Sequence, residues 1–179
     1  LFVGADWVQK VLNQPLENVS VDGALKQTDA GELRGSVWNL VSQRYLDIDL
    51  QQVKENLESH PWVHEVDVRR QWPAGLEIRV KEQIPVARWG QRGLLNGEGE
   101  VFVPAESMRF ETLPRFQGPE SRTLAMMAQF RSLNQQMRPL KLQLASLELE
   151  PRGAWSLTFN NGVRLLLGRG DLVEKVKRF

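Results

Sequence analysis

The sequence predicts an α+β protein with two domains. The first should be a small unit of two helices on a three-stranded sheet, and the second a mainly antiparallel β unit with one or two helices. Three observations support this. Apolar and charged residues alternate from Pro61 to Trp89, interrupted once by Trp72-Pro73-Ala74-Gly75. Two segments with helical spacing precede that stretch, and short alternating segments separated by turn residues follow it. Because strand side chains alternate between faces, the central stretch indicates a hairpin whose apolar face needs a cover.

The two arms of this hairpin can be assigned to faces by parity. The residues expected on the apolar face are Trp62, His64, Val66, Val68, Leu76, Ile78 and Val80. The residues expected on the charged face are Val63, Glu65, Asp67, Arg69, Glu77, Arg79 and Lys81. A sheet of this kind buries one side and leaves the other in water.

Two helices are expected to cover the apolar face. Asp29 should cap the first, with Glu32 completing a capping box, and Asp49 should cap the second. The second helix should end before Pro61, because the residue before a proline avoids the α conformation. A short strand near 18–21 completes the order strand, helix, helix, strand, strand, which is a two-layer arrangement.

We expect a leading segment over residues 1–17, a first domain over 18–84 and a second over 85–179. In the second domain, Asn96-Gly97-Glu98-Gly99 is a strong hairpin turn signal. Residues 104–119 contain three prolines and predict a loop, and Ser121 is expected to cap the long helix that follows.

Composition excludes several kinds of function. The chain has 23 basic and 22 acidic residues, so its net charge of +1 gives no case for nucleic-acid binding. It has no cysteine, which excludes thiol catalysis and Cys-ligated metals. Its histidines, His60 and His64, have a spacing that suits a helical metal site, but Pro61 between them favours structural roles. Arg169-Gly170-Asp171 spells an adhesion tripeptide, although Asp171 as a helix cap is the better interpretation. We therefore expect no enzyme, cofactor or metal.

Several short motifs occur in an order that is specific as a set. They are Pro61-Trp62, V-x-V-R-x-Q-W-P at 66–73, E-x-x-P-x-A-R-W at 82–89, Asn96-Gly97-Glu98-Gly99, Leu113-Pro114, Gly118-Pro119-Glu120, Trp155-Ser156-Leu157, Asn160-Asn161 and L-G-R-G-D at 167–171. By these motifs the chain resembles the FtsQ/DivIB family of bacterial cell-division proteins, and the proteobacterial branch most. The resemblance covers nearly the whole chain.

That resemblance implies a POTRA domain followed by a β domain, both in the periplasm, in a single-pass inner-membrane protein at the division septum. It implies a non-enzymatic divisome scaffold that binds FtsB and FtsL through the β domain and upstream proteins such as FtsK through the POTRA domain. Residues 1–17 would then be membrane-proximal, with a membrane helix expected before Leu1. The chain ends before the family's last strands, which carry the FtsB-binding edge, so the main partner site is expected to be incomplete.

Three residues match family positions linked to partner binding. Arg152 matches a position close to the FtsB interface, and the alternative is a solvated arginine in a turn. Val68 and Arg70 match positions linked to recruitment by upstream proteins. Their alternatives are sheet core for Val68 and a solvated strand end for Arg70.

Two other function classes remain as alternatives. One is a POTRA-type polypeptide-binding domain of an outer-membrane assembly or secretion system. The other is an enzyme such as a cell-wall hydrolase, although no nucleophile elbow, phosphate loop or dinucleotide fingerprint is present. Without a catalytic constellation, strand edges and charged sheet faces point to protein binding.

Overall fold

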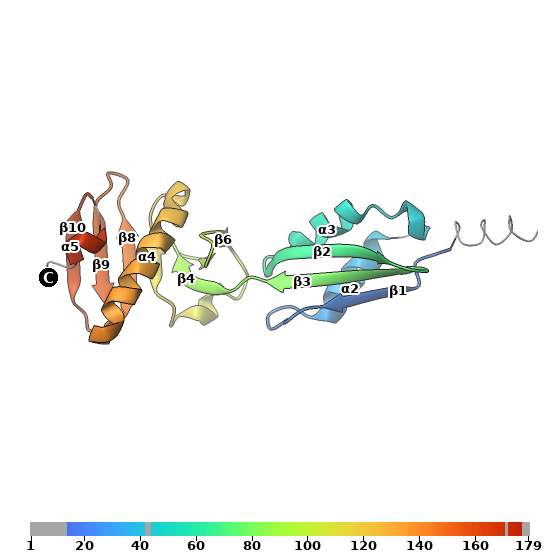
Figure 1. The fold of residues 1–179 in the computed structure, drawn as a ribbon, viewed down its shortest axis with the longest axis horizontal. Coiled ribbons are helices and arrows are strands. Elements are labelled where there is room, and N and C mark those ends of the chain that lie inside the picture. Colours follow the sequence, from blue (N-terminus) through green and yellow to red (C-terminus); the bar gives the residue numbers. More distant parts are fainter. Residues whose placement is uncertain (1–13, 42–43, 171, 177–179) are drawn as a thin grey trace, which may run out of the picture. The chain divides into compact units, whose positions relative to one another are not determined.

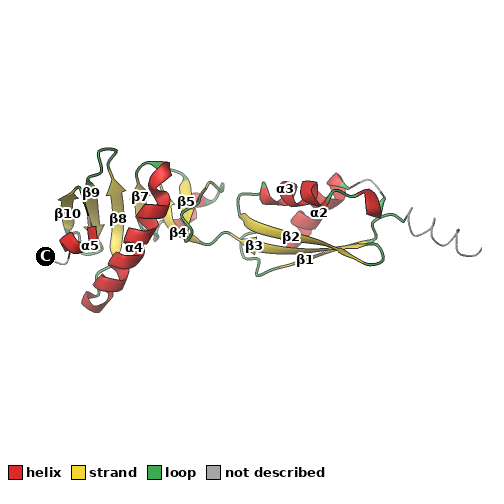
Figure 2. Ribbon diagram, turned by 45° about the horizontal axis from the view of Figure 1, so that its top comes forward, coloured by secondary structure: helices red, strands yellow, loops and turns green. Residues whose placement is uncertain are grey.

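The computed structural model describes residues 14–41, 44–170 and 172–176. The chain divides into two compact units, Leu1–Gln83 and Ile84–Phe179 (Figure 1). The first has two helices on a small sheet, and the second is a larger, mainly antiparallel sheet with one long helix (Figure 2). The predicted α+β fold class is therefore confirmed.

The first unit follows the predicted order of elements. They are β1 (Asn18–Asp22), α2 (Ala30–Leu40), the 3₁₀ helix η1 (Tyr45–Asp47), α3 (Leu50–Glu58), β2 (Val63–Gln71) and β3 (Gly75–Glu82). The strand order is β1-β3-β2, with β1 parallel and β2 antiparallel to the central strand β3. Both α-helices cover the same face of this sheet (Figure 2).

Both helices of the first unit begin at the predicted caps. The Asp29 side chain accepts a hydrogen bond from the backbone N–H of Glu32, 2.9 Å away. The Asp49 side chain accepts from Gln51 and Gln52 at 2.9 and 3.3 Å. Each cap satisfies backbone donors that the first helical turn leaves free.

The assignment of hairpin residues to two faces by parity holds except at the start of β2. Val66, Leu76, Ile78 and Val80 are buried in the core beneath the helices. Val63, which parity had placed on the charged face, is also buried in this core. The reason is a β-bulge: the pairing with β3 shifts register between Val63 and Glu65. An extra residue in one strand moves the preceding side chain to the other face.

One carboxylate fastens the loop between β1 and α2 to the end of β3. Glu82 accepts hydrogen bonds from the backbone N–H groups of Lys26, Gln27 and Thr28 and from the Thr28 hydroxyl. Burial of Glu82 raises the pKa of its carboxyl, but these hydrogen bonds lower it by more, so the pKa lies below its ordinary value of 4.5. Glu82, the first residue of the E-x-x-P-x-A-R-W motif, therefore has a structural role. We call this group of hydrogen bonds between Glu82 and residues 26–28 the Glu82 clasp.

The second unit is built on seven strands and one long helix. Its strands are β4 (Pro85–Trp89), β5 (Gly93–Asn96), β6 (Val101–Phe102), β7 (Arg115–Gln117), β8 (Leu144–Leu149), β9 (Trp155–Phe159) and β10 (Arg164–Gly168). Its helices are η2 (Ser107–Phe110), η3 (Glu120–Arg122), α4 (Thr123–Met137), η4 (Arg138–Leu140) and α5 (Leu172–Val176). The strand order is β10-β9-β8-β7-β4-β5-β6.

Strand β7 is the main departure from the sequence prediction. It lies within residues 104–119, where the proline content predicted a loop, and it pairs in parallel with both β4 and β8. It joins two antiparallel groups into one sheet, β4-β5-β6 and β8-β9-β10. A strand of three residues carries no detectable periodicity, so local sequence could not indicate it.

The two faces of this sheet differ sharply. On one face, Ala87, Trp89, Phe116, Leu147 and Leu157 are buried against α4. The α4 residues that meet them are Met126, Met127, Phe130, Leu133 and Met137, so the methionines form core rather than a binding face. The opposite face carries a row of register partners that crosses the sheet: Leu94, Arg88, Arg115, Ser146, Thr158 and Arg164.

Two turn features also bear on the predictions. Asn96 closes the predicted hairpin turn, because its Oδ1 accepts from the N–H groups of Glu98 and Glu100 at 2.9 Å. The expected cap at Ser121 is wrong: η3 precedes α4, and the N-cap position falls on Arg122, whose side chain makes no capping hydrogen bond. Within the described residues, no helix is long and apolar enough to span a membrane.

Candidate protein-binding surfaces

The first candidate surface surrounds Arg152. This residue is exposed in the turn between β8 and β9, which is closed by hydrogen bonds from Gly153 N to Glu150 O and from Glu150 N to Ala154 O. Gly153 has φ +86°, a conformation that glycine adopts without strain. A Cβ at Gly153 would lie 3.9 Å from Cγ of Arg169, so this turn lies beside the segment that follows β10.

Strand β10 is one end of the sheet. It pairs with β9 on one side, and no described strand pairs with its other side. Leu166 in this strand is 72% exposed, and Val163, the residue before the strand begins, is also exposed. An exposed strand edge with apolar side chains is a template for an incoming strand.

Helix α5 contacts the C-terminal end of β10 through a side chain and does not pair with the strand. Leu172 and Val176 are buried in the same core as α4, so the helix packs against the apolar layer. Its Lys175 ammonium donates hydrogen bonds to the carbonyl oxygens of Leu167 and Arg169. Among the contacts of the described residues, those of Lys175 lie at the C-terminal end of β10.

The second candidate surface is on β2 in the first unit, where Val68 and Arg70 lie two residues apart on the helix-facing side. Val68 is half-buried and packs against the core, opposite Ile78. Arg70 is exposed near the end of β2, but its guanidinium is held by backbone carbonyl groups. Its guanidinium donates to the carbonyl oxygen of Tyr45, and to those of Leu46 at 3.2 Å and Ile48 at 2.8 Å.

The geometry gives Arg70 a clear structural role. Its guanidinium carbon also lies 5.4 Å from the centre of the Tyr45 ring, a cation–π distance. These contacts join the end of β2 to η1 and to the start of α3. Strand β2 is itself one of the two edge strands of the first sheet.

Of the other residues singled out in the sequence, His60 makes a structural contact and Asp171 lies outside the described residues. His60 Nδ1 accepts from the N–H of Trp62 at 3.3 Å, within the turn that ends α3. In the Arg169-Gly170-Asp171 tripeptide, Asp171 falls outside the described residues, so its role as a cap stays a prediction. Trp72 is 64% exposed at the tip of the hairpin, whereas Trp89 is buried.

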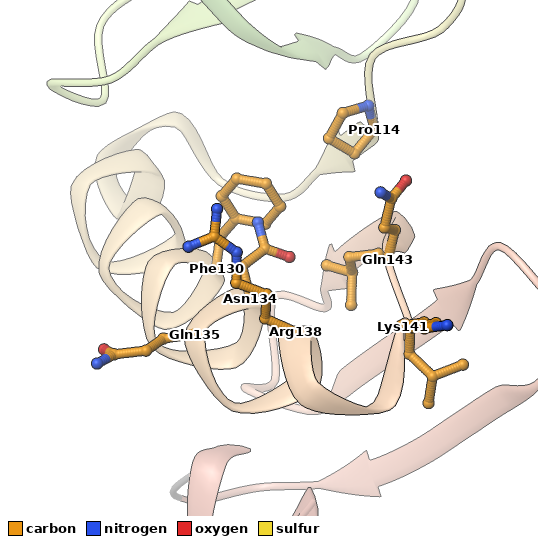
Figure 3. A pocket seen from close by; sticks show the side chains of 9 residues that line it. Pro114, Phe130, Asn134, Gln135, Arg138, Lys141 and Gln143 are labelled. Carbon is orange, nitrogen blue, oxygen red and sulfur yellow. The ribbon is translucent and has the colours of Figure 1, made fainter.

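A cavity of about 650 Å³ opens at the C-terminal end of α4. Phe130, Asn134 and Arg138 reach into it from the helical side, and Pro114 and Gln143 lie across from them (Figure 3). Among the described residues that line it, none is a histidine, an acid or a hydroxyl nucleophile. Lys141 is the lining residue whose side chain could act as a base or a nucleophile, and it is exposed in the turn before β8.

The sequence analysis named Arg152, whose role in binding stays a prediction, and did not name Val163 or Leu166. A usable signal was present in the run Leu165-Leu166-Leu167, because alternation sends the middle leucine to the face opposite its neighbours. Val68 and Arg70 are brought together on one strand, and Arg152 belongs to the other unit.

Comparison with known proteins gives a consistent result. Residues 14–83 match the model of the POTRA domain, FtsQ-type, and residues 87–179 match that of the cell division protein FtsQ/DivIB, C-terminal. The chain is 32% identical to the cell division protein FtsQ of Cellvibrio japonicus, covering 100% of this chain and 57% of the relative.

Two further relatives carry the same name. The cell division protein FtsQ of Shewanella oneidensis is 33% identical over 98% of this chain and 69% of its own length. That of Escherichia coli is 30% identical over 97% of this chain and 64% of its own length. The chain thus spans between 57% and 69% of the length of these three relatives. On these matches, and on the two units described above, the chain belongs to the FtsQ/DivIB family of cell division proteins.

Proposed function

We propose that this chain is the periplasmic part of a non-enzymatic divisome scaffold that binds FtsB and FtsL through its second unit. In this proposal the whole protein is anchored in the inner membrane at the septum by a helix before Leu1. The observation that carries the proposal is the open β10 side of the sheet, flanked by the exposed Arg152 turn.

Binding would proceed by addition of a strand on this side of the sheet. Main-chain hydrogen bonds would supply affinity, and side chains would fix the register. Arg152, beside this end of the sheet, would pair with an acidic residue of the incoming chain.

The test is Arg152→Glu in the complete periplasmic region, titrated with the soluble FtsB–FtsL region by calorimetry. Loss of one member of a partly desolvated interfacial pair costs about 2–5 kcal/mol, so the Kd should rise at least about 30-fold. Lys141→Glu reverses an exposed charge before β8 and serves as the matched control.

Two outcomes would count against this role for Arg152. If both charge reversals weaken binding equally, the effect is one of net charge. If Arg152→Glu weakens binding only together with a lowered Tm, the residue supports the fold. Release of peptidoglycan fragments by the purified chain would favour the enzyme class instead.

For the first unit we propose recruitment by an upstream divisome protein such as FtsK, through the β2 edge that carries Val68 and Arg70. Val68→Ala should reduce septal localisation of a fluorescent fusion while changing Tm little, because Val68 is only half-buried. Asp67→Asn, on the opposite face of the same strand, is the control. Unchanged localisation of the Val68 variant would remove this residue from the site.

The alternative, an outer-membrane assembly or secretion module, loses support from the comparisons. The first unit matches the FtsQ-type POTRA domain, and the second matches the FtsQ/DivIB C-terminal domain.

A further inference from the structure

A second hollow in the β unit concentrates positive charge. It has a volume of about 300 Å³ and lies among β4, β7, η2 and the turn that leads into β5. Three arginines line it, Arg88, Arg92 and Arg115, together with the buried Ser107 and the exposed Met108. Among the described residues that form its walls, none is acidic.

The fold itself forces two of these charges together. Arg88 on β4 and Arg115 on β7 are register partners in neighbouring parallel strands, so both side chains leave the same face of the sheet. Adjacent strands lie only about 4.8 Å apart, and like charges directly opposite one another are destabilising. Arg92 joins them from the turn that follows β4.

The protein does not neutralise this cluster from within. In the described parts of the chain, none of the three arginine side chains forms an ion pair or a hydrogen bond. The Nε of Arg88 is buried and has no acceptor. A guanidinium cannot shed its proton in a protein, and a buried donor without a partner is unfavourable. Both costs would be relieved by an oxyanion held in the hollow.

We propose that this hollow binds carboxylate side chains of an acidic segment of a partner polypeptide. The guanidinium fork matches a carboxylate in two-point hydrogen bonding. The volume is small for a metabolite site but suits one or two acidic side chains. Met108, 62% exposed at the rim, offers the apolar contact that a peptide makes beside its charges. Arginine and methionine are both enriched where proteins meet.

This site is separate from the proposed FtsB edge. In the strand order, β7 and β4 lie three and four positions from β10, which places them about 14–19 Å away across the sheet. The two proposals can therefore fail independently.

The test uses the 179-residue chain and two fluorescein-labelled peptides, Gly-Glu-Glu-Glu-Glu-Gly and its glutamine counterpart. Fluorescence anisotropy gives the affinity, and the Nε–H resonances of the arginines give the location. The glutamate peptide should bind at least about tenfold more tightly than the glutamine peptide, as charge-assisted hydrogen bonds predict. The Nε–H resonance of Arg88 should shift on binding.

Arg88→Gln and Arg115→Gln should each weaken the glutamate peptide about tenfold or more. Arg164→Gln is the matched control, because Arg164 belongs to the same row of the same sheet face but lies on β10. Arg115 is exposed, so Arg115→Gln should not affect the fold. The peptide affinity of this variant therefore still tests the proposal if Arg88→Gln lowers the Tm.

Three results would overturn the proposal. The first is equal affinity for the two peptides, and the second is an equal loss in the Arg164 variant. The third is displacement of the glutamate peptide by inorganic phosphate, or binding to phosphatidylglycerol vesicles, with the same dependence on Arg88. Those last outcomes would assign the hollow to a free anion or to a lipid surface.

Discussion

The two sheets of this protein carry charge in different ways. On the wet face of the first, residues of opposite sign stand across from each other on β2 and β3, as at Asp67 and Arg79 or Arg69 and Glu77. On the second, Arg88 stands across from Arg115. The first sheet neutralises its charges internally, and the second leaves them for another molecule. A charge in the first unit should therefore be tested for stability, and one in the second for binding.

The largest effect should come from a charge in the core of the first unit. Ile78 is 0% exposed at the centre of β3, and Ile78→Asp should lower the free energy of unfolding by about 4 kcal/mol or more. Glu77→Gln, one residue away on the wet face, should change it little. Urea unfolding followed by NMR of the first unit measures both variants. Equal losses would mean that the two faces do not differ as described.

Arg70→Gln should come next, because it removes hydrogen bonds to three backbone carbonyls around η1. We expect a loss of about 2 kcal/mol in the free energy of unfolding. The control is Arg69→Gln, which breaks an exposed ion pair with Asp67 worth less than about 1 kcal/mol. If Arg70→Gln leaves stability intact yet abolishes recruitment, the residue acts at the partner surface instead.

Glu82 should give the first unit a pH dependence. Because its folded pKa lies below 4.5, the ionised clasp contributes its full stability above that pH, and the contribution is lost as pH falls through the folded pKa. The unfolding free energy of Glu82→Gln should therefore fall less than that of the wild type between pH 5 and 3. Parallel pH profiles for the two proteins would rule out the clasp.

The smallest effect should be found in the second unit. Arg115→Gln removes one of two like charges that face each other and breaks no hydrogen bond of the described residues. Its Tm should equal that of the wild type or lie slightly above it, as differential scanning calorimetry can show. A clear fall in Tm would mean that Arg115 has an internal partner. That result would contradict the statement that the second sheet, unlike the first, leaves its charges unpaired.

The sequence predicted what depends on near neighbours. Asp29 and Asp49 were identifiable as caps because a cap acts within one turn of its helix. The turn at Asn96 was identifiable for the same reason. The burial of Val63 was missed, because a bulge depends on the register with β3 rather than on the residues around it.

The candidate sites also divide into those that local sequence can indicate and those that depend on long-range pairing. The resemblance led to Arg152 and alternation could have led to Leu166, but nothing linked Arg88 to Arg115 before the fold was known. Those two residues meet only because β7 pairs in parallel with β4, across a segment that composition marks as loop. Long-range parallel pairing has no local signature, so a site built on it is invisible in sequence.

The parallel pair β1 and β3 has a mechanical consequence. The chain enters the first unit at the start of β1 and leaves it at the end of β3, and the two strands run side by side in register from Asn18 opposite Gly75 to Asp22 opposite Arg79. A pull between the two ends of the unit would slide one strand along the other, and the hydrogen bonds of the ladder would bear it together rather than opening one by one. The unit is thus arranged to transmit tension along the chain.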